Sequence, residues 1–356
     1  MTMKVLALNP GSTSTKVALF EDGAEVWNET QRYDVDVLGK YASVMEQEDF
    51  RLEEITAMLG RRGVTPGDLD AVVGRGGLLH PIESGTYAVN EKMLSEVREC
   101  KWGCHASNLG ALLAVRLAGE GNGRAYIVDP VVVDELCPLA RYTGLVEIGR
   151  RSIFHALNQK MTARRAAREI GKPYEECELI VAHMGGGISI GAHHQGRVID
   201  VNNALDGDGP FSPERAGSLP TGGLVRLCYS KKYEPAQLLR MITGKGGLIA
   251  HLGTNDLREV ERRIEAGDEH AKLIYEAMAY QVARSIGAAA AVLEGTVDGI
   301  VLTGGLAYSE RFVGLIEPRV RFIAPVLVYP GEDELKALAD GAFRVLKGQE
   351  EAKTYE

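Results

Sequence analysis

Two short turns of small residues, one in each half of the chain, carry the residue types that bind phosphate groups. The first turn, residues 9–16 (Asn-Pro-Gly-Ser-Thr-Ser-Thr-Lys), follows the apolar run 5–8, and the second, residues 185–187 (Gly-Gly-Gly), follows the apolar run 179–183. Glycine lets backbone N–H groups approach an anion, hydroxyl groups add further donors, and a lysine supplies a point charge. The two turns predict a nucleotide held between two related domains.

The residues around the two turns follow the same order, which predicts an internal duplication. Each turn is followed by a strand-like run, a tight turn at 21–23 or 194–196, and another strand-like run. This order is typical of an antiparallel meander. Further apolar runs alternate with helical patterns, which predicts an α/β fold. We expect one domain over residues 1–150, joined by the segment 328–356, and a second over residues 151–327. The predicted strands are 3–8, 16–20, 70–73, 125–128, 179–183, 188–192, 197–201, 299–303 and 325–329, and the predicted helices are 91–99, 106–118, 157–170, 257–266, 269–294 and 333–347.

The composition is that of a globular enzyme large enough for two domains, with 356 residues, 45% of them hydrophobic and 25% charged. A formal charge of −9 argues against nucleic acid or an anionic membrane as the main partner. The five cysteines form an odd set without a C-x-x-C pair, so we expect reduced thiols and neither a disulfide framework nor a zinc site. No leader pattern and no run of 18 apolar residues is evident, which favours a cytoplasmic protein.

At its two turns the sequence resembles the acetate and butyrate kinase family, within the sugar kinase, Hsp70 and actin superfamily. Residues 9–16 match the first signature of that family, and residues 181–187 resemble its second. Further blocks occur in the order of the family and extend the resemblance over nearly the whole chain: residues 73–77, 105–108, 128–130, 151–155, 215–217, 256–258 and 303–305.

The resemblance implies two duplicated ribonuclease-H-like domains of the actin-like ATPase kind, with a nucleotide cleft between them. It also implies reversible phosphoryl transfer between ATP and a small carboxylic acid, Mg²⁺ as cofactor, and a homodimer or larger homo-oligomer. Residues 184–187 read Met-Gly-Gly-Gly where acetate kinases usually have Leu-Gly-Asn-Gly, and the stretch 206–214 also departs from the acetate pattern. These departures resemble the butyrate kinase branch, so the expected acid is butyrate or a branched relative.

Transfer of a phosphoryl group to a carboxylic acid is mainly a problem of charge. The acid is already ionised at pH 7, so no general base is needed, but it must approach a polyanionic phosphate. The site therefore needs cations and N–H donors directed at the phosphoryl oxygens. Arg75, at the predicted carboxyl end of a strand, Arg215 and His155 are the candidates. The resemblance implies that Arg75 contacts the acid and that Arg215 contacts the transferred phosphoryl group.

The magnesium ion should bridge phosphate oxygens and keep most of its water. Asp129, directly after a predicted strand, is the first candidate to position the ion or to orient the transferred group. Asn9 is the second, and Asp333, which falls on the metal-linked glutamate of the family in an ungapped match, is the third. His105 is about as compatible with a structural role as with a functional one.

The expected nucleotide contacts fall into four segments. Hydroxyl groups and Lys16 in the first turn should meet a phosphate, the second turn should hold the other phosphates, a later pair of glycines should face the adenosine, and the segment 256–258 resembles one that flanks the ribose or base. The residues are Asn9, Gly11, Ser12, Ser14, Lys16, His183, Gly185, Gly186, Gly187, Asp256, Arg258, Gly304 and Gly305.

Three alternatives remain open at this stage. The first is an acetate or propionate kinase, which has the same chemistry on a shorter acid. The second is a sugar or polyol kinase of the same superfamily, in which Asp129 would be the base that deprotonates a hydroxyl group. The third is a nucleotide-gated scaffold of the Hsp70 or actin kind, which would need an additional peptide-binding or polymerisation segment.

Overall fold

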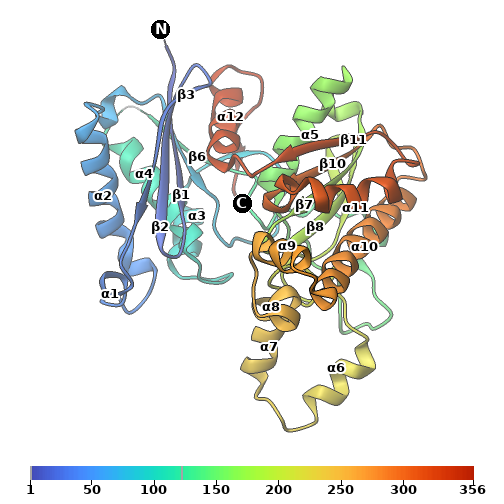
Figure 1. The fold of residues 1–356 in the computed structure, drawn as a ribbon. Helices are drawn as coiled ribbons and strands as arrows, with labels where there is room; N and C mark the ends of the chain where they lie inside the picture. The colour runs from blue at the N-terminus through green and yellow to red at the C-terminus, as the bar shows by residue number, and fades with distance from the viewer. Residues whose placement is uncertain (1, 122) are drawn as a thin grey trace. The chain divides into compact units, whose positions relative to one another are not determined.

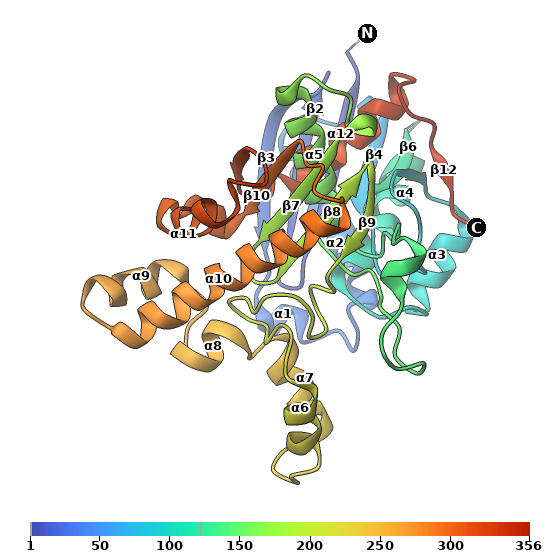
Figure 2. The same ribbon diagram turned by 90° about the vertical axis from the view of Figure 1, so that its right-hand side faces the viewer.

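The computed structural model describes residues 2–121 and 123–356, and its contacts divide the chain into two compact units (Figures 1 and 2). Unit 1 consists of the chain up to Val133 together with Asp333–Glu356, and unit 2 is Asp134–Glu332. The domain limits at 150 and 328 stay a prediction, because contacts define compact units and do not test which segments fold independently.

Unit 1 is built on a seven-stranded sheet with the order β12-β5-β6-β4-β1-β2-β3. β1, β2 and β3 form the expected antiparallel meander, and β4 and β6 extend it as parallel strands. Figure 1 shows α2 and α4 on one side of this sheet and α12, from the C-terminal segment, on the other. The bounds are β1 Lys4–Pro10, β2 Ser14–Glu21, β3 Ala24–Arg32, α1 Val35–Leu38, α2 Glu48–Arg61, β4 Ala71–Arg75, β5 Thr86–Ala88, α3 Glu91–Arg98, α4 Leu109–Gly119, β6 Arg124–Val128, α12 Glu334–Leu346 and β12 Lys353–Thr354.

Unit 2 is built on a five-stranded sheet with the order β11-β10-β7-β8-β9. Successive residues of β7 face opposite sides of the sheet. Ile180 and Ala182 belong to the core cluster that contains α10, and Leu179 and Val181 belong to the cluster with α5. The bounds are α5 Ala156–Ile170, β7 Glu178–Met184, β8 Ile188–His194, β9 Arg197–Val201, α6 Thr221–Cys228, α7 Pro235–Thr243, α8 Gly247–Leu252, α9 Leu257–Glu265, α10 Glu269–Val292, β10 Gly299–Gly304, α11 Glu310–Val320 and β11 Val326–Pro330.

The two sheets repeat the same arrangement, as the sequence predicts. The order β6-β4-β1-β2-β3 in unit 1 corresponds to β11-β10-β7-β8-β9 in unit 2, with the same parallel and antiparallel pairs. The α/β class and the duplication are thereby confirmed. None of the helices that the structure describes is long and apolar enough to cross a membrane.

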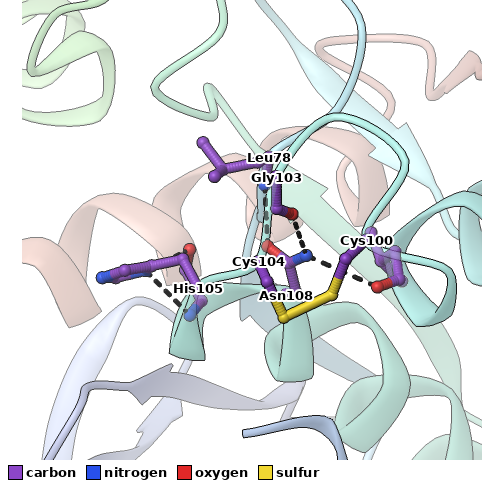
Figure 3. The surroundings of a disulfide bond; sticks show 8 residues. Leu78, Cys100, Gly103, Cys104, His105 and Asn108 are labelled. Carbon is purple, nitrogen blue, oxygen red and sulfur yellow. Dashed lines mark hydrogen bonds between the residues drawn. A yellow bond between two sulfur atoms is a disulfide. The ribbon is translucent and has the colours of Figure 1, made fainter. Parts of the chain in front are cut away.

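The expectation of five reduced thiols is wrong for two of the cysteines, because Cys100 and Cys104 form a disulfide bond (Figure 3). Cys100 follows α3 with a φ of 50°, and Gly103 has a φ of 127°. These left-handed positions turn the chain sharply and bring the two Cα atoms to 4.8 Å. A spacing of four residues therefore suffices here, although it matches no recognised redox or zinc motif.

Candidate active site

The first phosphate-type turn joins β1 to β2 in the tight hairpin that its sequence predicts. Asn9 pairs with Lys16 across the two strands, and the N–H group of Gly11 donates to the carbonyl of Ser14 at 2.7 Å. Ser12 is exposed, as is the Lys16 side chain. The turn thus presents hydroxyl groups and a cation at the surface of unit 1, which is where a phosphate could reach them.

Arg75 lies beside this turn, because β4 runs parallel to β1 and both strands end at the same edge of the sheet. Its Nη1 atom is 3.0 Å from Oε1 of Glu334 and donates a long hydrogen bond of 3.5 Å to Oδ1 of Asn9. The Asn9 amide in turn donates to Glu334. The structure therefore brings together two residues that the sequence predicts and one, Glu334, that sequence reasoning missed.

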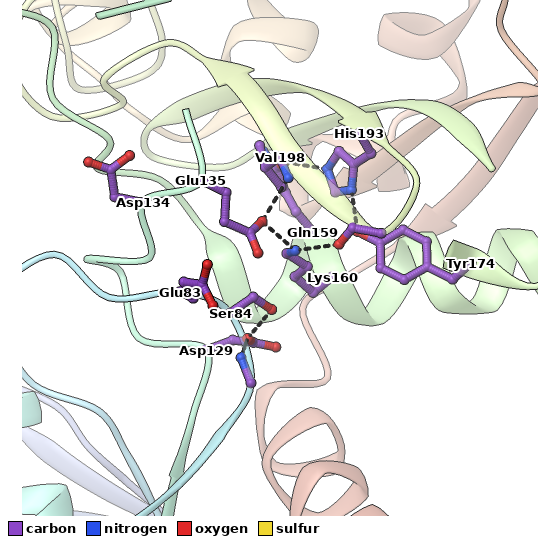
Figure 4. A network of polar contacts seen from close by, with 12 residues as sticks. Glu83, Ser84, Asp129, Asp134, Glu135, Gln159, Lys160, Tyr174, His193 and Val198 are labelled. Carbon is purple, nitrogen blue, oxygen red and sulfur yellow. Dashed lines mark hydrogen bonds and ion pairs between the residues drawn. The ribbon is translucent and has the colours of Figure 1, made fainter. Parts of the chain in front are cut away.

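Asp129 extends the same edge, since it directly follows β6, the strand next to β4. Its φ is 38°, only 2% of the residue is exposed, and its Oδ1 accepts hydrogen bonds from the Ser84 hydroxyl at 2.7 Å and from the Gly85 amide at 2.8 Å (Figure 4). A left-handed aspartate costs free energy and needs surrounding contacts to hold it. These contacts fix the carboxylate at the carboxyl ends of the strands, where open α/β sheets bind ligands.

His105 and Asp333 also belong to unit 1. His105 precedes a short 3₁₀ turn, and its Nδ1 accepts a hydrogen bond from the Ser107 amide at 3.2 Å. Burial and, to a smaller extent, the charge of Arg75 lower the pKa of His105. Asp333 caps α12 with a φ of 33°, and its side chain makes no capping hydrogen bond. Asp333 thus lies next to Glu334, the residue that contacts Arg75.

His155 and His183 form a stacked pair in unit 2. Their ring centroids are 3.8 Å apart with an interplanar angle of 13°. Nδ1 of His155 is 2.9 Å from the Ser189 hydroxyl, and Nδ1 of His183 is 2.7 Å from Oδ1 of Asn158. Nε2 of His183 lies 3.4 Å from a Glu332 oxygen without the geometry of a hydrogen bond. These contacts hold both rings in place.

The glycine turn of unit 2 lies directly against Arg215. A Cβ atom built on Gly187 would lie 1.8 Å from Nη1 of Arg215, and one built on Gly186 would lie 3.1 Å from the carboxyl group of Glu214. Arg215 donates to the carbonyl of Ala204, and its buried Nε has no hydrogen-bond partner among the residues that the structure describes. Burial lowers the pKa of Arg215, against the opposing charge of Glu214. Only glycine lets the backbone come this close to the guanidinium.

The predicted nucleoside segments occupy two places in unit 2. Gly304 ends β10 with a φ of 87°, and a Cβ atom there would lie 2.4 Å from the carbonyl oxygen of Met184, the residue before the glycine turn. Asp256 caps α9 and pairs with the exposed Arg258 through two 3.0 Å hydrogen bonds. The neighbouring Asn255 donates to Glu214 at 2.9 Å, which links this segment to the surroundings of Arg215.

The comparisons with known proteins identify the family of this chain. A model described as "Acetokinase family" matches residues 141–314. Butyrate kinase 2 of Clostridium acetobutylicum is 54% identical over 355 residues, which cover 100% of this chain and 100% of that protein. This chain belongs to the acetokinase family. The resemblance inferred from the motifs is confirmed, including its greater likeness to butyrate kinase.

Two solved kinase structures resemble this chain in fold. An acetate kinase from Porphyromonas gingivalis has a TM-score of 0.76 at 22% identity, over 96% of this chain and 99% of that one. A propionate kinase from Francisella tularensis has a TM-score of 0.74 at 18% identity, over 94% of this chain and 98% of that one. The expected fold class, two duplicated domains of the actin-like ATPase kind, is confirmed.

The chain offers oxygen donors of the kind that Mg²⁺ prefers, although its described part has no group of three or more His, Cys, Asp or Glu side chains that could hold a metal ion. Asn9 and Glu334 place an amide oxygen and a carboxylate at one edge of the sheet in unit 1, and Asp129 follows a strand at the same edge. Mg²⁺ keeps several waters and needs only one or two protein carboxylates. The donors in unit 1 therefore fit the ion.

Proposed function

We propose that this member of the acetokinase family transfers a phosphoryl group reversibly between ATP and a short-chain fatty acid, with butyrate or a branched relative as the preferred acid. The products in one direction are an acyl phosphate and ADP. The chain is a phosphotransferase with a carboxyl group as acceptor. The observation that supports the longer acid is the 54% identity, over the full length of both chains, to a protein named Butyrate kinase 2.

In this proposal Arg75 binds the carboxylate of the fatty acid. Arginine presents a rigid fork of donors that matches a carboxylate in two parallel hydrogen bonds. Only Nη1 of Arg75 is engaged, by Glu334 and Asn9, among the residues that the structure describes. The other N–H groups of the guanidinium can therefore donate to the carboxylate of the substrate while Glu334 keeps the side chain in place.

Arg215 is proposed to stabilise the transferred phosphoryl group, and the turn 185–187 to hold the remaining phosphates with backbone N–H groups. Arg215 has a buried Nε without a partner in the described part of the chain, and a group left unpaired inside a protein costs free energy until a ligand satisfies it. His155 and His183 would supply donors beside the transferred oxygens, since Ser189 and Asn158 hold each ring in one orientation.

Asp129, Asn9 and Asp333 are proposed to hold Mg²⁺, largely through water, and Glu334 joins them because of its contact with Asn9. The ion, when bound, neutralises charge on the phosphate oxygens. Gly11, Ser12, Ser14 and Lys16 are proposed to bind the phosphoryl group, and Asp256, Arg258, Gly304 and Gly305 to contact the nucleoside. An assembly of at least two copies and a cytoplasmic location remain proposals that rest on the family.

The proposed reaction is tested by trapping its product. The protein is incubated with ATP, Mg²⁺ and hydroxylamine, and with acetate, propionate, butyrate or isobutyrate in turn. An acyl phosphate yields a hydroxamate, and the highest kcat/KM is expected for butyrate or isobutyrate. A higher kcat/KM for acetate or propionate would assign the shorter acid. ATP consumption with a sugar and without hydroxamate would refute a carboxylate kinase.

A further inference from the structure

Arg51 is a buried cation in unit 1 to which the proposed reaction gives no role. It lies in α2, its exposed fraction is 0%, and Nη1 donates to the carbonyl groups of Gly11 at 2.8 Å and Ser14 at 3.2 Å. Its Nη2 donates to the carbonyl of Ser12 at 3.3 Å. The buried guanidinium therefore binds three carbonyl groups of the first turn, in which Ser12 is exposed.

The other hydrogen-bonding groups of this turn divide into carbonyl groups that are bonded within the described part of the protein and donors that are not. The carbonyl of Thr13, the remaining one within residues 11–14, accepts a hydrogen bond of 3.0 Å from the Tyr33 amide. The N–H groups of Ser12 and Thr13, and the hydroxyl groups of Ser12, Thr13 and Ser14, have no partner within residues 2–121 and 123–356. All four carbonyl groups of residues 11–14 are thus bound within the protein and these donors are left for a ligand, which is the arrangement that an anion requires.

Arg51 also has no acidic partner. Its Nε and Nη2 donate to Oε1 of Gln47, at 3.1 and 2.8 Å, and the ring of Tyr33 lies 4.9 Å from the guanidinium carbon. No carboxylate of the described chain forms an ion pair with it. A buried charge without a counter-charge is costly, and burial lowers the pKa of Arg51. Arginine nevertheless keeps its proton in proteins, so the positive charge persists.

We propose that Arg51 is a positioning residue for the phosphoryl group, which fixes the donors of the first turn and draws an anion to it with an unbalanced positive charge. The inference rests on the proposed function for the identity of that anion. An anion in the turn would offset the buried charge, so phosphate binding and folding stability are coupled through Arg51.

Gln47→Glu tests the charge while leaving the hydrogen bonds in place. Gln47 is 7% exposed, and glutamate has nearly the same shape and keeps an acceptor for both bonds from Arg51. The melting temperature should stay the same or rise, because Arg51 gains a counter-charge. Inorganic phosphate should protect this variant less than the wild type, with an affinity about 10-fold weaker, and KM for ATP should rise about 10-fold while KM for the fatty acid changes less than about twofold.

Thr56→Glu is the matched control, since it adds the same charge on an exposed position of α2. It should leave phosphate protection and both KM values as in the wild type. If Gln47→Glu also behaves as the wild type, or if it shifts both KM values equally, Arg51 is only a structural support and the inference fails.

Arg51→Lys and Arg51→Met keep the inference testable if Gln47→Glu does not fold. Lysine retains the charge without the fork, so it should retain more phosphate protection than methionine, and equal losses would overturn the inference. Phosphate protection is read from the melting temperature and needs no turnover. Protection that depends on Arg51 in a protein that forms no acyl phosphate would refute the proposed function alone.

Discussion

The two phosphate-type turns occupy equivalent places in the duplicated sheets but use arginine in different ways. In unit 1, Arg51 lies behind the turn 9–16 and binds its carbonyl groups. In unit 2, Arg215 lies against the glycines themselves, and a Cβ atom at Gly187 would overlap its guanidinium. The first turn can therefore keep hydroxyl side chains and a lysine, whereas the second must be bare backbone.

The difference separates two tasks of a cation at a phosphate site. A guanidinium behind the turn acts on the anion through the field of its charge and through the backbone it orders, and a guanidinium in front can touch the transferred oxygens. Removal of the arginine in front should therefore reduce the rate of the chemical step, and neutralisation of the one behind should mainly reduce binding.

The largest effect is expected for Arg215→Ala. Loss of an arginine that stabilises a transferred phosphoryl group lowers kcat by about 10³-fold or more. KM for ATP should change much less, in contrast to Gln47→Glu. Hydroxamate formation at saturating substrates measures kcat, and Arg226→Ala, on an exposed position of α6, is the control. A change in KM alone would show that Arg215 only binds the nucleotide, and the contrast between the turns would be lost.

The next effect concerns stability and uses a buried cation that has an acidic partner. Lys160 is 1% exposed at its side chain and lies 2.6 Å from Glu135, which also accepts from the Val198 amide at 2.7 Å (Figure 4). Lys160→Met leaves this acid buried and unpaired, and should lower the free energy of unfolding by about 3–5 kcal/mol.

Urea titration measures this loss, and phosphate should not change it, because Lys160 has its own counter-charge. The double variant Lys160→Met/Glu135→Gln should recover part of the stability, since glutamine keeps an acceptor for the Val198 amide. If phosphate changed the loss of stability in Lys160→Met, a buried cation with an acidic partner would respond to phosphate as Arg51 is expected to. The contrast between Lys160 and Arg51 would then fail.

The sequence predicts the two turns, Arg75 and the duplication, but it does not predict the role of Arg51. The turns, Arg75 and the duplication follow from local patterns, because strands that end at the same sheet edge bring Asn9 and Arg75 together. Arg51 was missed although Leu52, Ile55 and Leu59 have the spacing of an apolar helix face, which would have predicted α2. That pattern gives the helix but not the carbonyl groups its arginine reaches.

Glu334 and the disulfide show what local patterns cannot supply. Glu334 reaches Asn9 across 325 residues, because the C-terminal segment returns to unit 1 as α12. Some of the site residues named by the resemblance form local groups within each unit. Asn9 and Arg75 meet in unit 1, and in unit 2 His155 stacks on His183 while Gly187 lies against Arg215. Cys100 and Cys104 meet because two residues with positive φ turn the chain between them, and nothing in the residue types demands that geometry.

Alanine substitutions of one glycine in each turn should affect the rate differently, and both effects should be smaller than that of Arg215→Ala. Gly187→Ala must displace Arg215, and a misplacement of about 1 Å in a catalytic group costs about 10²-fold in rate. A Cβ atom at Gly11 would lie 3.4 Å from the Ser14 carbonyl, an ordinary contact, so Gly11→Ala should reduce the rate far less. Hydroxamate assays of both variants make the comparison. Equal losses would mean that both turns need bare backbone.

The smallest effect concerns Glu96, a buried acid in unit 1. In contrast to Arg51, Glu96 has a partner of opposite charge, Lys101, and further hydrogen-bond donors around it. It accepts hydrogen bonds from Lys101 at 2.8 Å, Trp102 at 2.7 Å and Tyr355 at 2.6 Å. Burial raises the pKa of Glu96, but the bonds from Lys101, Tyr355 and Trp102 outweigh it and lower the pKa to about 2. Because the folded pKa lies below the unfolded one, Glu96 stabilises the fold above the ordinary glutamate range, and this contribution is lost as the pH falls from 4.5 towards 2.

Glu96→Gln should therefore be less stable than the wild type at pH 6, and the difference should shrink as the pH falls from 4.5 towards 2. Unfolding in urea at a series of pH values measures it, with Glu99→Gln, at the exposed residue that follows α3, as the control. Phosphate should not change the difference, because Glu96 already has its cation in Lys101. A difference that is independent of pH would mean that Glu96 stabilises the fold through the shape of its side chain and not through its charge. Glu96 could then no longer serve as the buried charge with a counter-charge against which Arg51 is compared.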